Sequence, residues 1–355
     1  MKMTSLRLLL WCFSGVITRN HCLPPIGTQP EQVHISYPGL KNSMLITWSS
    51  ANETESVVEY GVWGGKLFTH SAKGTESVFV NEGVEQRVMF IHRVLLSNLT
   101  PGASYVYHCG SSFGWSDIFF FSALNESDNG RIGDEFMRQI ESIAAYTPYM
   151  TCPGNHEWVA NFSQYRSRFS MPGDTESLWY SWNIGPAHII SFSTEVYFYL
   201  EFGLDLLFTQ YQWLRSDLEV RMGRNDTTPP APGLEDLFYQ YGVDLELWAH
   251  EHTYERLWPV YNYKVLNGSS EEPYVNPKAP VHIITGSAGC REKHDGFIPH
   301  PRDWSAFRSS DYGYTRMHVI NHTHLYLEQV SDDQYGKVID KMMLVKEKHG
   351  AHAWS

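Results

Sequence analysis

The sequence predicts a two-domain protein of mixed class, in which a β-sandwich is followed by an α/β domain. Between residues 31 and 123, short stretches of alternating apolar and polar residues are separated by turn residues, the pattern of sandwich strands. Beyond a polar segment at residues 125–130, apolar residues at helical spacing alternate with short apolar runs. The 355 residues, 42% of them hydrophobic, are enough for two buried cores.

The first domain, residues 28–123, resembles a fibronectin type III module. Strands are expected at residues 43–48, 87–94 and 104–109. The turn at residues 99–102 precedes Tyr105 and Tyr107, an arrangement that resembles a tyrosine corner, in which a phenol ties down a loop. Such a domain usually supports or binds and seldom catalyses.

The second domain, residues 131–345, is expected to alternate helices and strands. Helices are expected at residues 136–144, 210–220 and 234–241, and strands at 149–152, 187–193, 243–248 and, from about residue 278 onward, at 281–285, 315–320 and 324–330. Two polar loops, residues 153–157 and 249–253, directly follow expected strands. Open α/β sheets place their sites at the carboxyl ends of strands, so we expect these loops to carry the site.

The two loops contain the side chains best suited to chemistry. Asn155 and His156 lie in the first loop, and His250 and His252 lie in the second. In extended backbone, residues two apart point to the same side, and imidazole is the commonest metal ligand. Alone, the first loop is equally compatible with an ordinary polar turn, and an isolated His-x-His is more often a pair of exposed or core histidines. Together, their amide oxygen and imidazoles favour a site for Fe, Zn or Mn.

The amino terminus predicts entry into the secretory pathway. Lys2 and Arg7 precede an apolar run at residues 8–17, which is typical of a signal peptide, placed here at residues 1–23. The run is shorter than the roughly 20 residues of a membrane-spanning helix, and no later segment reaches that length, so no integral membrane span is expected. An uncleaved signal anchor is the alternative interpretation.

Seven glycosylation sequons reinforce this prediction of a secreted or lysosomal glycoprotein. They begin at Asn52, Asn98, Asn125, Asn161, Asn225, Asn267 and Asn321. Removal of a signal peptide leaves Cys109, Cys152 and Cys290, an odd set that cannot all pair within one chain.

The charge balance excludes one class of partner. Lys and Arg number 27 against 39 Asp and Glu, a formal charge of −12, whereas nucleic-acid binders carry basic surfaces. No nucleic-acid partner is therefore expected. Protonation of all 17 histidines would reverse the sign of the net charge, which is compatible with an acidic compartment.

With these motifs, the chain resembles the purple acid phosphatases, metallophosphoesterases in which a fibronectin-like sandwich precedes a two-metal catalytic domain. The resemblance covers most of the chain. It rests on Gly154-Asn-His-Glu157, on Ala249-His-Glu-His-Thr-Tyr-Glu-Arg256, on Val281-His-Ile-Ile-Thr-Gly-Ser-Ala-Gly289, and on the sandwich segments Pro30-Glu-Gln-Val-His-Ile-Ser-Tyr37 and Met44-Leu-Ile-Thr-Trp48.

The resemblance implies hydrolysis of phosphate monoesters by a metallophosphoesterase α/β sandwich that holds Fe and Zn, or Mn. It implies that Asn155 ligates one metal and bridges toward the other, that His252 binds the first metal and that His250 binds the second. His156 would contact the phosphate and assist the leaving group. Two cations about 3.5–4 Å apart can hold a phosphate and activate water, but neutral ligands alone leave their charge poorly balanced.

The sequence departs from the family at the anionic ligands. The family's strand-end Asp and its Gly-Asp-x-x-Tyr motif have no counterpart between residues 124 and 136. Gly133-Asp134 lacks the following Tyr and lies on an expected helix, so we interpret Asp134 as a helix N-cap rather than a ligand. Residues 221–233 contain no histidine for the family's fourth motif. Two internal blocks are therefore predicted to be missing, and the metallophosphoesterase domain to be partial.

Two hypotheses for function follow. In the first, the chain is a purple-acid-phosphatase-type hydrolase; in the second, it is a catalytically silent secreted glycoprotein. The number of anionic metal ligands at the motif positions separates them, and that number is zero, which predicts weak or absent activity. A phosphate monoester is the expected substrate, and the sequence specifies no oligomeric state.

Overall fold

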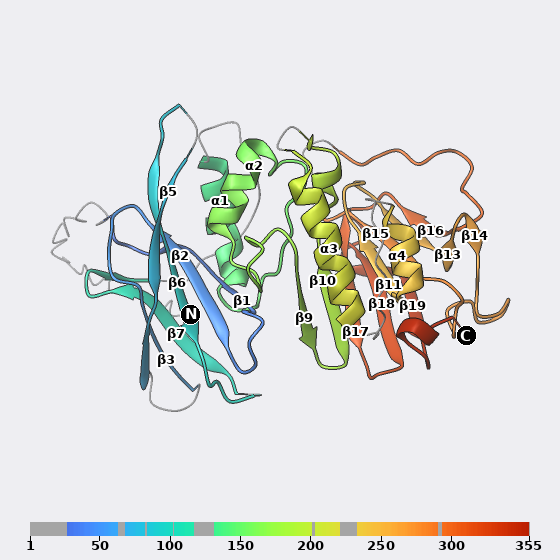
Figure 1. The fold of residues 1–355 in the computed structure, drawn as a ribbon, viewed down its shortest axis with the longest axis horizontal. Helices are drawn as coiled ribbons and strands as arrows, with labels where there is room; N and C mark the ends of the chain where they lie inside the picture. Colours follow the sequence, from blue (N-terminus) through green and yellow to red (C-terminus); the bar gives the residue numbers. More distant parts are fainter. Residues whose placement is uncertain are drawn as a thin grey trace, which may run out of the picture.

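The computed structural model describes residues 27–62, 68–81, 84–101, 103–116, 131–200, 203–220, 233–289 and 293–354. A β-sandwich and an α/β part lie side by side along the long axis of the molecule, with helix α1 beside the sandwich (Figure 1). The predicted signal peptide, the polar segment at 125–130, and Asn125, Asn225 and Cys290 lie outside the described residues.

The sandwich consists of two four-stranded sheets, as the alternating pattern predicts. One sheet has the order β1-β2-β6-β5 and the other the order β4-β3-β7-β8. The strands are β1 (Glu31–Ser36), β2 (Met44–Ser50), β3 (Val57–Val62), β4 (His70–Lys73), β5 (Thr75–Val80), β6 (Val88–Leu96), β7 (Tyr105–Ser111) and β8 (Gly114–Trp115). Alternation turns Ile46, Trp48, Val58 and Cys109 into the core between the sheets.

The tyrosine corner is confirmed. The Thr100 backbone N–H donates to the Tyr105 hydroxyl at 2.9 Å, which ties the turn to strand β7. Two residues later, the Tyr107 hydroxyl donates to the Ala145 carbonyl at 2.5 Å, immediately after α1 (Arg131–Ala144). The sandwich is thus bonded directly to the first helix of the α/β part.

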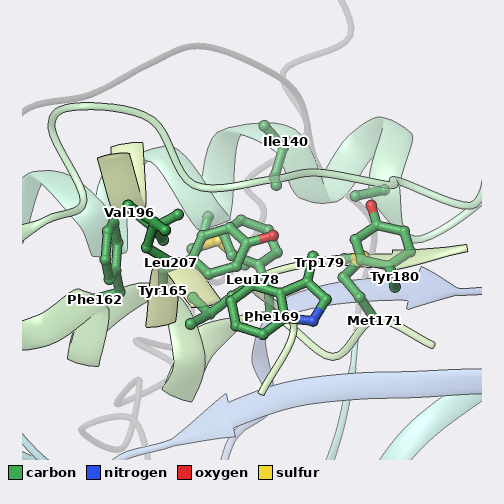
Figure 2. Close-up of a cluster of buried hydrophobic side chains, with 12 residues drawn as sticks. Ile140, Phe162, Tyr165, Phe169, Met171, Leu178, Trp179, Tyr180, Val196 and Leu207 are labelled. Atoms are coloured by element: carbon green, nitrogen blue, oxygen red, sulfur yellow. The ribbon is translucent and has the colours of Figure 1, made fainter. Parts of the chain in front are cut away.

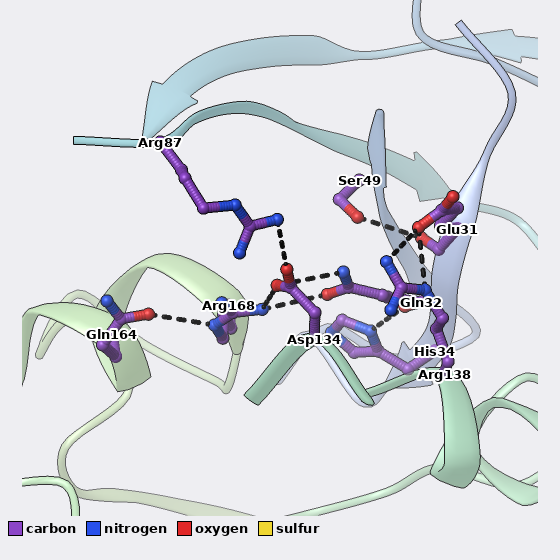
Figure 3. Close-up of polar contacts among 9 residues, drawn as sticks. All are labelled: Glu31, Gln32, His34, Ser49, Arg87, Asp134, Arg138, Gln164 and Arg168. Atoms are coloured by element: carbon purple, nitrogen blue, oxygen red, sulfur yellow. Dashed lines mark hydrogen bonds and ion pairs between the residues drawn. The ribbon is translucent and has the colours of Figure 1, made fainter. Parts of the chain in front are cut away.

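A buried polar network joins α1 to the sandwich (Figure 3). The Asp134 carboxylate pairs with Arg87 at 2.7 Å and with Arg168 at 2.8 Å, and the Arg168 guanidinium also donates to the Gln32 side chain. The expected N-cap role of Asp134 is therefore wrong. Because α1 begins at Arg131, Asp134 lies inside the first turn, where two guanidinium groups take its carboxylate.

The α/β part has an aromatic-rich core beside α1 (Figure 2). Its elements are α2 (Val159–Arg168), β9 (Tyr180–Ile184), β10 (Ala187–Ser191), the short helix η1 (Thr194–Tyr197) and α3 (Asp205–Val220). The buried cluster is Met137, Ile140, Ala144, Phe162, Tyr165, Phe169, Met171, Leu178, Trp179, Tyr180, Val196 and Leu207.

The strand expected at residues 149–152 does not form, so this prediction is wrong. The Tyr149 N–H donates to the Ile35 carbonyl at 3.0 Å, and the Thr151 carbonyl accepts from the hydroxyls of Tyr165 at 2.8 Å and Tyr180 at 2.6 Å. A strand requires a continuous backbone ladder with a neighbour. Here a sandwich carbonyl and two tyrosine hydroxyls take those hydrogen bonds instead.

The remaining elements are two helical segments and the strands of a mixed sheet, an antiparallel sheet and a separate two-stranded sheet. They are α4 (Leu234–Gln240), β11 (Leu245–Trp248), β12 (Tyr254–Leu257), β13 (Val260–Tyr261), β14 (Lys264–Val265), β15 (Val281–Thr285), β16 (Ser305–Ser309), β17 (Gly313–Val319), β18 (His324–Ser331), β19 (Lys337–Val345) and the 3-10 turn η3 (Gly350–His352). The orders are β11-β15-β12-β16 and β17-β18-β19, so β11, parallel to β15, lies at a sheet edge.

The other expected helices and strands of the α/β part are confirmed, with α1 and α3 each beginning five residues earlier than expected. Within the described residues, no helix is long and apolar enough to cross a membrane.

Candidate functional site

The first motif loop, residues 153–157, is a tight turn between the extended segment at 149–152 and α2. The Gly154 N–H donates to the Glu157 carboxylate at 2.8 Å, and the Glu157 N–H returns to the Gly154 carbonyl at 3.1 Å. Burial raises the pKa of Glu157. Asn155 is half-buried and His156 is exposed at the tip, so the turn presents an imidazole to solvent.

Contacts from the η1 region hold this loop in place. The Ser193 hydroxyl donates to the Pro153 carbonyl at 2.7 Å, and the Tyr199 hydroxyl donates to the Asn155 carbonyl at 3.3 Å. The Tyr199 ring also stacks on Trp158, with 4.9 Å between the ring centroids. The position of Asn155 is therefore set by the segment that follows β10, rather than by a strand preceding the loop.

The second motif loop, residues 249–253, follows β11 directly, as predicted. His250 has φ of +82°, so the chain turns sharply in the left-handed region at this residue. The loop then crosses the end of β15 so closely that a Cβ on Gly286 would lie 2.0 Å from the Glu251 carbonyl oxygen. The Gly286 N–H donates to the Thr253 carbonyl at 3.1 Å. Only glycine permits this approach.

A buried carboxylate, Glu195 in η1, is influenced electrostatically by both loops. Burial raises the pKa of Glu195, while the imidazoles of His250 and His156 oppose that shift. Both imidazoles therefore lie within electrostatic reach of one carboxylate. His156 and His250, which influence the same carboxylate, are 94 residues apart in sequence.

His252 has different surroundings from His250. Its backbone N–H donates to the Asp295 carboxylate at 2.5 Å, and its ring Nδ1 donates to the Lys293 carbonyl at 3.3 Å. The same-side rule applies to extended backbone, and the left-handed turn at His250 interrupts it. The two histidines of the motif therefore contact different segments of the chain.

The end of the second motif is structural. Arg256 forms a two-pronged ion pair with Asp340 on β19, with Nε–Oδ2 and Nη2–Oδ1 distances of 2.7 and 2.8 Å. The Tyr254 hydroxyl donates to the same carboxylate at 2.9 Å. All three side chains are buried, so this part of the motif fixes β12 against the antiparallel sheet.

The donor atoms of these residues determine which metal centre they can form. An imidazole that donates Nδ1–H to a carbonyl carries its lone pair on Nε2, which suits His252 as a metal ligand. Among the described residues, however, no group of three or more His, Cys, Asp or Glu side chains could hold a metal ion. The residues present therefore fit ligation by a single imidazole and do not fit a closed two-cation centre.

A cavity of about 620 Å³ lies elsewhere, in the sandwich. Its charged lining is three carboxylates and one lysine, Glu53, Glu55, Glu76 and Lys73. This excess of negative charge disfavours a phosphate ester, so the motif loops are the better candidate site.

Glu195 and Asp295 are site residues that sequence reasoning missed. Glu195 follows the end of β10 by four residues, so the strand-end rule that selected the two loops could have found it. Asp295 lies in a loop with no motif or periodicity, and only the tertiary fold brings it to His252.

Comparisons with known proteins identify the family. Residues 30–123 match the model of the purple acid phosphatase N-terminal domain, residues 125–254 match calcineurin-like phosphoesterase, and residues 279–341 match iron/zinc purple acid phosphatase-like protein C. Acid phosphatase type 7 of Danio rerio is 67% identical, over 93% of this chain and 94% of the relative. The chain belongs to the purple acid phosphatase family. The reaction of this family is the metal-dependent hydrolysis of phosphoric monoesters.

More distant relatives support the same family and fold. Acid phosphatase type 7 of Homo sapiens is 46% identical, over 90% of this chain and 92% of the relative. The structure of a purple acid phosphatase from yellow lupin (Lupinus luteus) seeds has a TM-score of 0.70 at 20% identity, over 90% of this chain and 74% of that chain. This likeness confirms the predicted mixed β and α/β fold.

The alignments with these relatives span more positions than this chain supplies. The aligned 93% of this chain is about 330 residues, yet the alignment with the Danio rerio relative spans 417 positions, so about 87 positions of the relative have no counterpart here. The same comparison with the Homo sapiens relative, 402 positions against about 320 residues, gives about 82. Purple acid phosphatases related to this chain therefore carry segments that it lacks.

Proposed function

We propose that this chain hydrolyses phosphate monoesters at the surface between the loops at 153–157 and 249–253. The observation that supports the proposal is that His156 and His250, one from each motif loop, both lie within electrostatic reach of Glu195. Family membership supplies the reaction class, since the relatives are named acid phosphatases.

The roles of the individual residues follow from family membership. His156, exposed at the tip of its turn, would contact the phosphate and donate a proton to the leaving group. In the family's two-metal site, which holds Fe and Zn or Mn, Asn155, His250 and His252 would be ligands; in this chain the described residues fit ligation by one imidazole, that of His252. Bound metal would supply Lewis-acid stabilisation of charge.

We expect slow turnover. Anionic ligands are absent from the motif positions, and about 87 positions of the Danio rerio relative are missing. Removal of one group that stabilises developing charge typically costs about 10²–10³ in rate. The chain should therefore hydrolyse an aryl phosphate at least about 100-fold more slowly than that relative.

The test is aryl-phosphate turnover by the purified chain and by His156→Ala, His250→Ala and His322→Ala. His322 is an exposed histidine on the β17–β18 turn and serves as the matched control. The proposal predicts that activity disappears in the first two variants and persists in the control. Equal, measurable activity in all of them would contradict the assignment of the reaction to these loops, whereas no activity in any of them would favour the silent-glycoprotein hypothesis.

We further propose that the chain is a glycoprotein of the secretory pathway, secreted or lysosomal. The signal-peptide pattern supports this proposal, as do the exposed sequon residues Asn52, Asn98 and Asn321. Asn161 and Asn267 are half-buried and should be poorer acceptors. Enzymatic removal of N-glycans should increase gel mobility, and the triple variant with Gln at the three exposed positions should lose most of that shift. An unchanged mobility would contradict the proposal.

A further inference from the structure

The segment at residues 293–304, here called the strap, lies against the second motif loop. Three contacts join it to His252. The Asp295 carboxylate accepts the His252 backbone N–H at 2.5 Å and lies 3.8 Å from the ring Nδ1, and the Lys293 carbonyl accepts from Nδ1 at 3.3 Å. One short stretch of chain thus contacts both the backbone and the ring of His252.

We propose that Asp295 is a positioning residue that holds His252 as the Nδ1–H tautomer. By fixing the His252 backbone, its carboxylate keeps the Lys293 carbonyl, two residues away on the strap, in line with Nδ1. A carbonyl oxygen can only accept, so the ring proton stays on Nδ1 and the lone pair on Nε2. The consequence for catalysis rests on the proposed function, because the tautomer matters there only if His252 ligates a cation.

The strap is fixed firmly enough to act in this way. On β16, the Arg308 guanidinium donates to the Ile298 carbonyl at 3.2 Å and lies 5.0 Å from the Phe297 ring centroid. Arg308 is itself paired with Glu255 on β12 at 2.8 Å. Glu255 is three residues beyond His252, so Arg308 contacts both the strap and the strand that follows His252.

The nearby charge also suits a metal-binding imidazole. If His252 held a cation, its ring would carry more positive charge, and the Asp295 carboxylate 3.8 Å from Nδ1 would stabilise that charge. Outer partners of this kind commonly change metal affinity by about 10–100-fold when they are removed. Asp295 is therefore expected to affect the tautomer first and cation affinity as a result.

The direct test measures the ring ¹⁵N shifts of His252 in ¹⁵N-histidine-labelled, metal-free protein, assigned with His252→Ala. Wild type should show the Nδ1–H tautomer, and Asp295→Ala should shift the population toward Nε2–H. Asp303→Asn, which removes an exposed carboxylate from the same strap, should leave the wild-type pattern. An unchanged His252 tautomer in Asp295→Ala would overturn the proposal.

Asp295→Asn keeps an oxygen to accept the His252 N–H while it removes the charge, and so guards against misfolding of the alanine variant. It should keep the tautomer. In a calorimetric Zn²⁺ titration, Asp295→Ala should bind about 10–100-fold more weakly than Asp303→Asn. A changed tautomer with unchanged Zn²⁺ affinity would support the positioning role and overturn the proposed ligand role of His252.

Discussion

At the scale of single residues, the second motif combines two tasks within seven positions. His250 lies within electrostatic reach of Glu195, and His252 is hydrogen-bonded to the strap. Tyr254 and Arg256, in contrast, are buried against Asp340. Substitutions at the two ends of the motif should therefore have different effects. Substitution of a histidine should change activity, and substitution of the tyrosine or the arginine should lower stability.

Replacement of Asp340 by Ala should destabilise the protein by about 3–5 kcal/mol, because it leaves the Arg256 guanidinium buried without its counter-charge. Urea unfolding measures the change. Asp332→Ala, an exposed aspartate at the end of the same hairpin, is the control and should stay within about 0.5 kcal/mol of wild type. A similar small effect for Asp340→Ala would contradict the structural role of the pair.

The sequence was informative about site residues only where chemistry follows a motif. Asn155, His156, His250 and His252 belong to recognisable sequence motifs, so the sequence alone identified them as candidate site residues. Asp134 stands in an equally suggestive string, but its partners Arg87 and Arg168 come from distant segments, and the N-cap interpretation failed. Asp295 reaches His252 across 43 residues, and no local pattern reports such a contact.

At the scale of secondary structure, helical periodicity was a reliable guide, and apolar runs were reliable except at residues 149–152. Helices α1, α3 and α4 form where it predicted them, because an i to i−4 ladder needs no partner. The run at 149–152 is apolar enough for a strand, yet it forms none, since a strand depends on a neighbour that its own sequence does not encode.

Substitution of Gly286 by Ala should displace the second motif loop. The added Cβ would lie 2.0 Å from the Glu251 carbonyl oxygen, so the backbone of residues 250–252 must move. We expect a loss of about 1–3 kcal/mol in stability, as is typical of overpacking. The ring ¹⁵N shifts of His252 should also change. Gly296→Ala, on the strap, meets no atom within 4 Å and is the control. Equal behaviour of the two variants would contradict the requirement for glycine.

At the scale of the whole molecule, buried titratable groups should set how stability depends on pH. Burial raises the pKa of Glu141 to about 7 and that of Glu246 to about 8, and it lowers the pKa values of His34 and His92 to about 4. The carboxyl groups bind a proton more tightly in the folded state than in the unfolded state, so their contribution to folding stability falls as pH rises toward 8. The histidines bind a proton less tightly in the folded state, so their contribution to folding stability falls as pH drops from 6.5 toward 4.

Between about pH 4.5 and 6.5 the two effects oppose each other, so the thermal unfolding midpoint should form a plateau there and decline on either side. Calorimetry from pH 4 to 9 measures it. Glu246→Gln removes one group of the alkaline limb and should flatten the decline between about pH 6.5 and 8. A midpoint that rises steadily through that interval would contradict the sign of both carboxyl shifts.

The edge position of β11 bears on how the molecule behaves at high concentration. One side of this strand pairs with β15; in the described structure its other side is the end of the sheet, and Leu247 on it is 47% exposed. A sheet edge that carries an apolar side chain is a template for strand addition by another molecule. Self-association should therefore grow with concentration, and Leu247→Lys should suppress it with little change in unfolding temperature, because a charged edge residue opposes pairing. Light scattering across a dilution series measures this, and equal scattering by both proteins would show that association proceeds elsewhere.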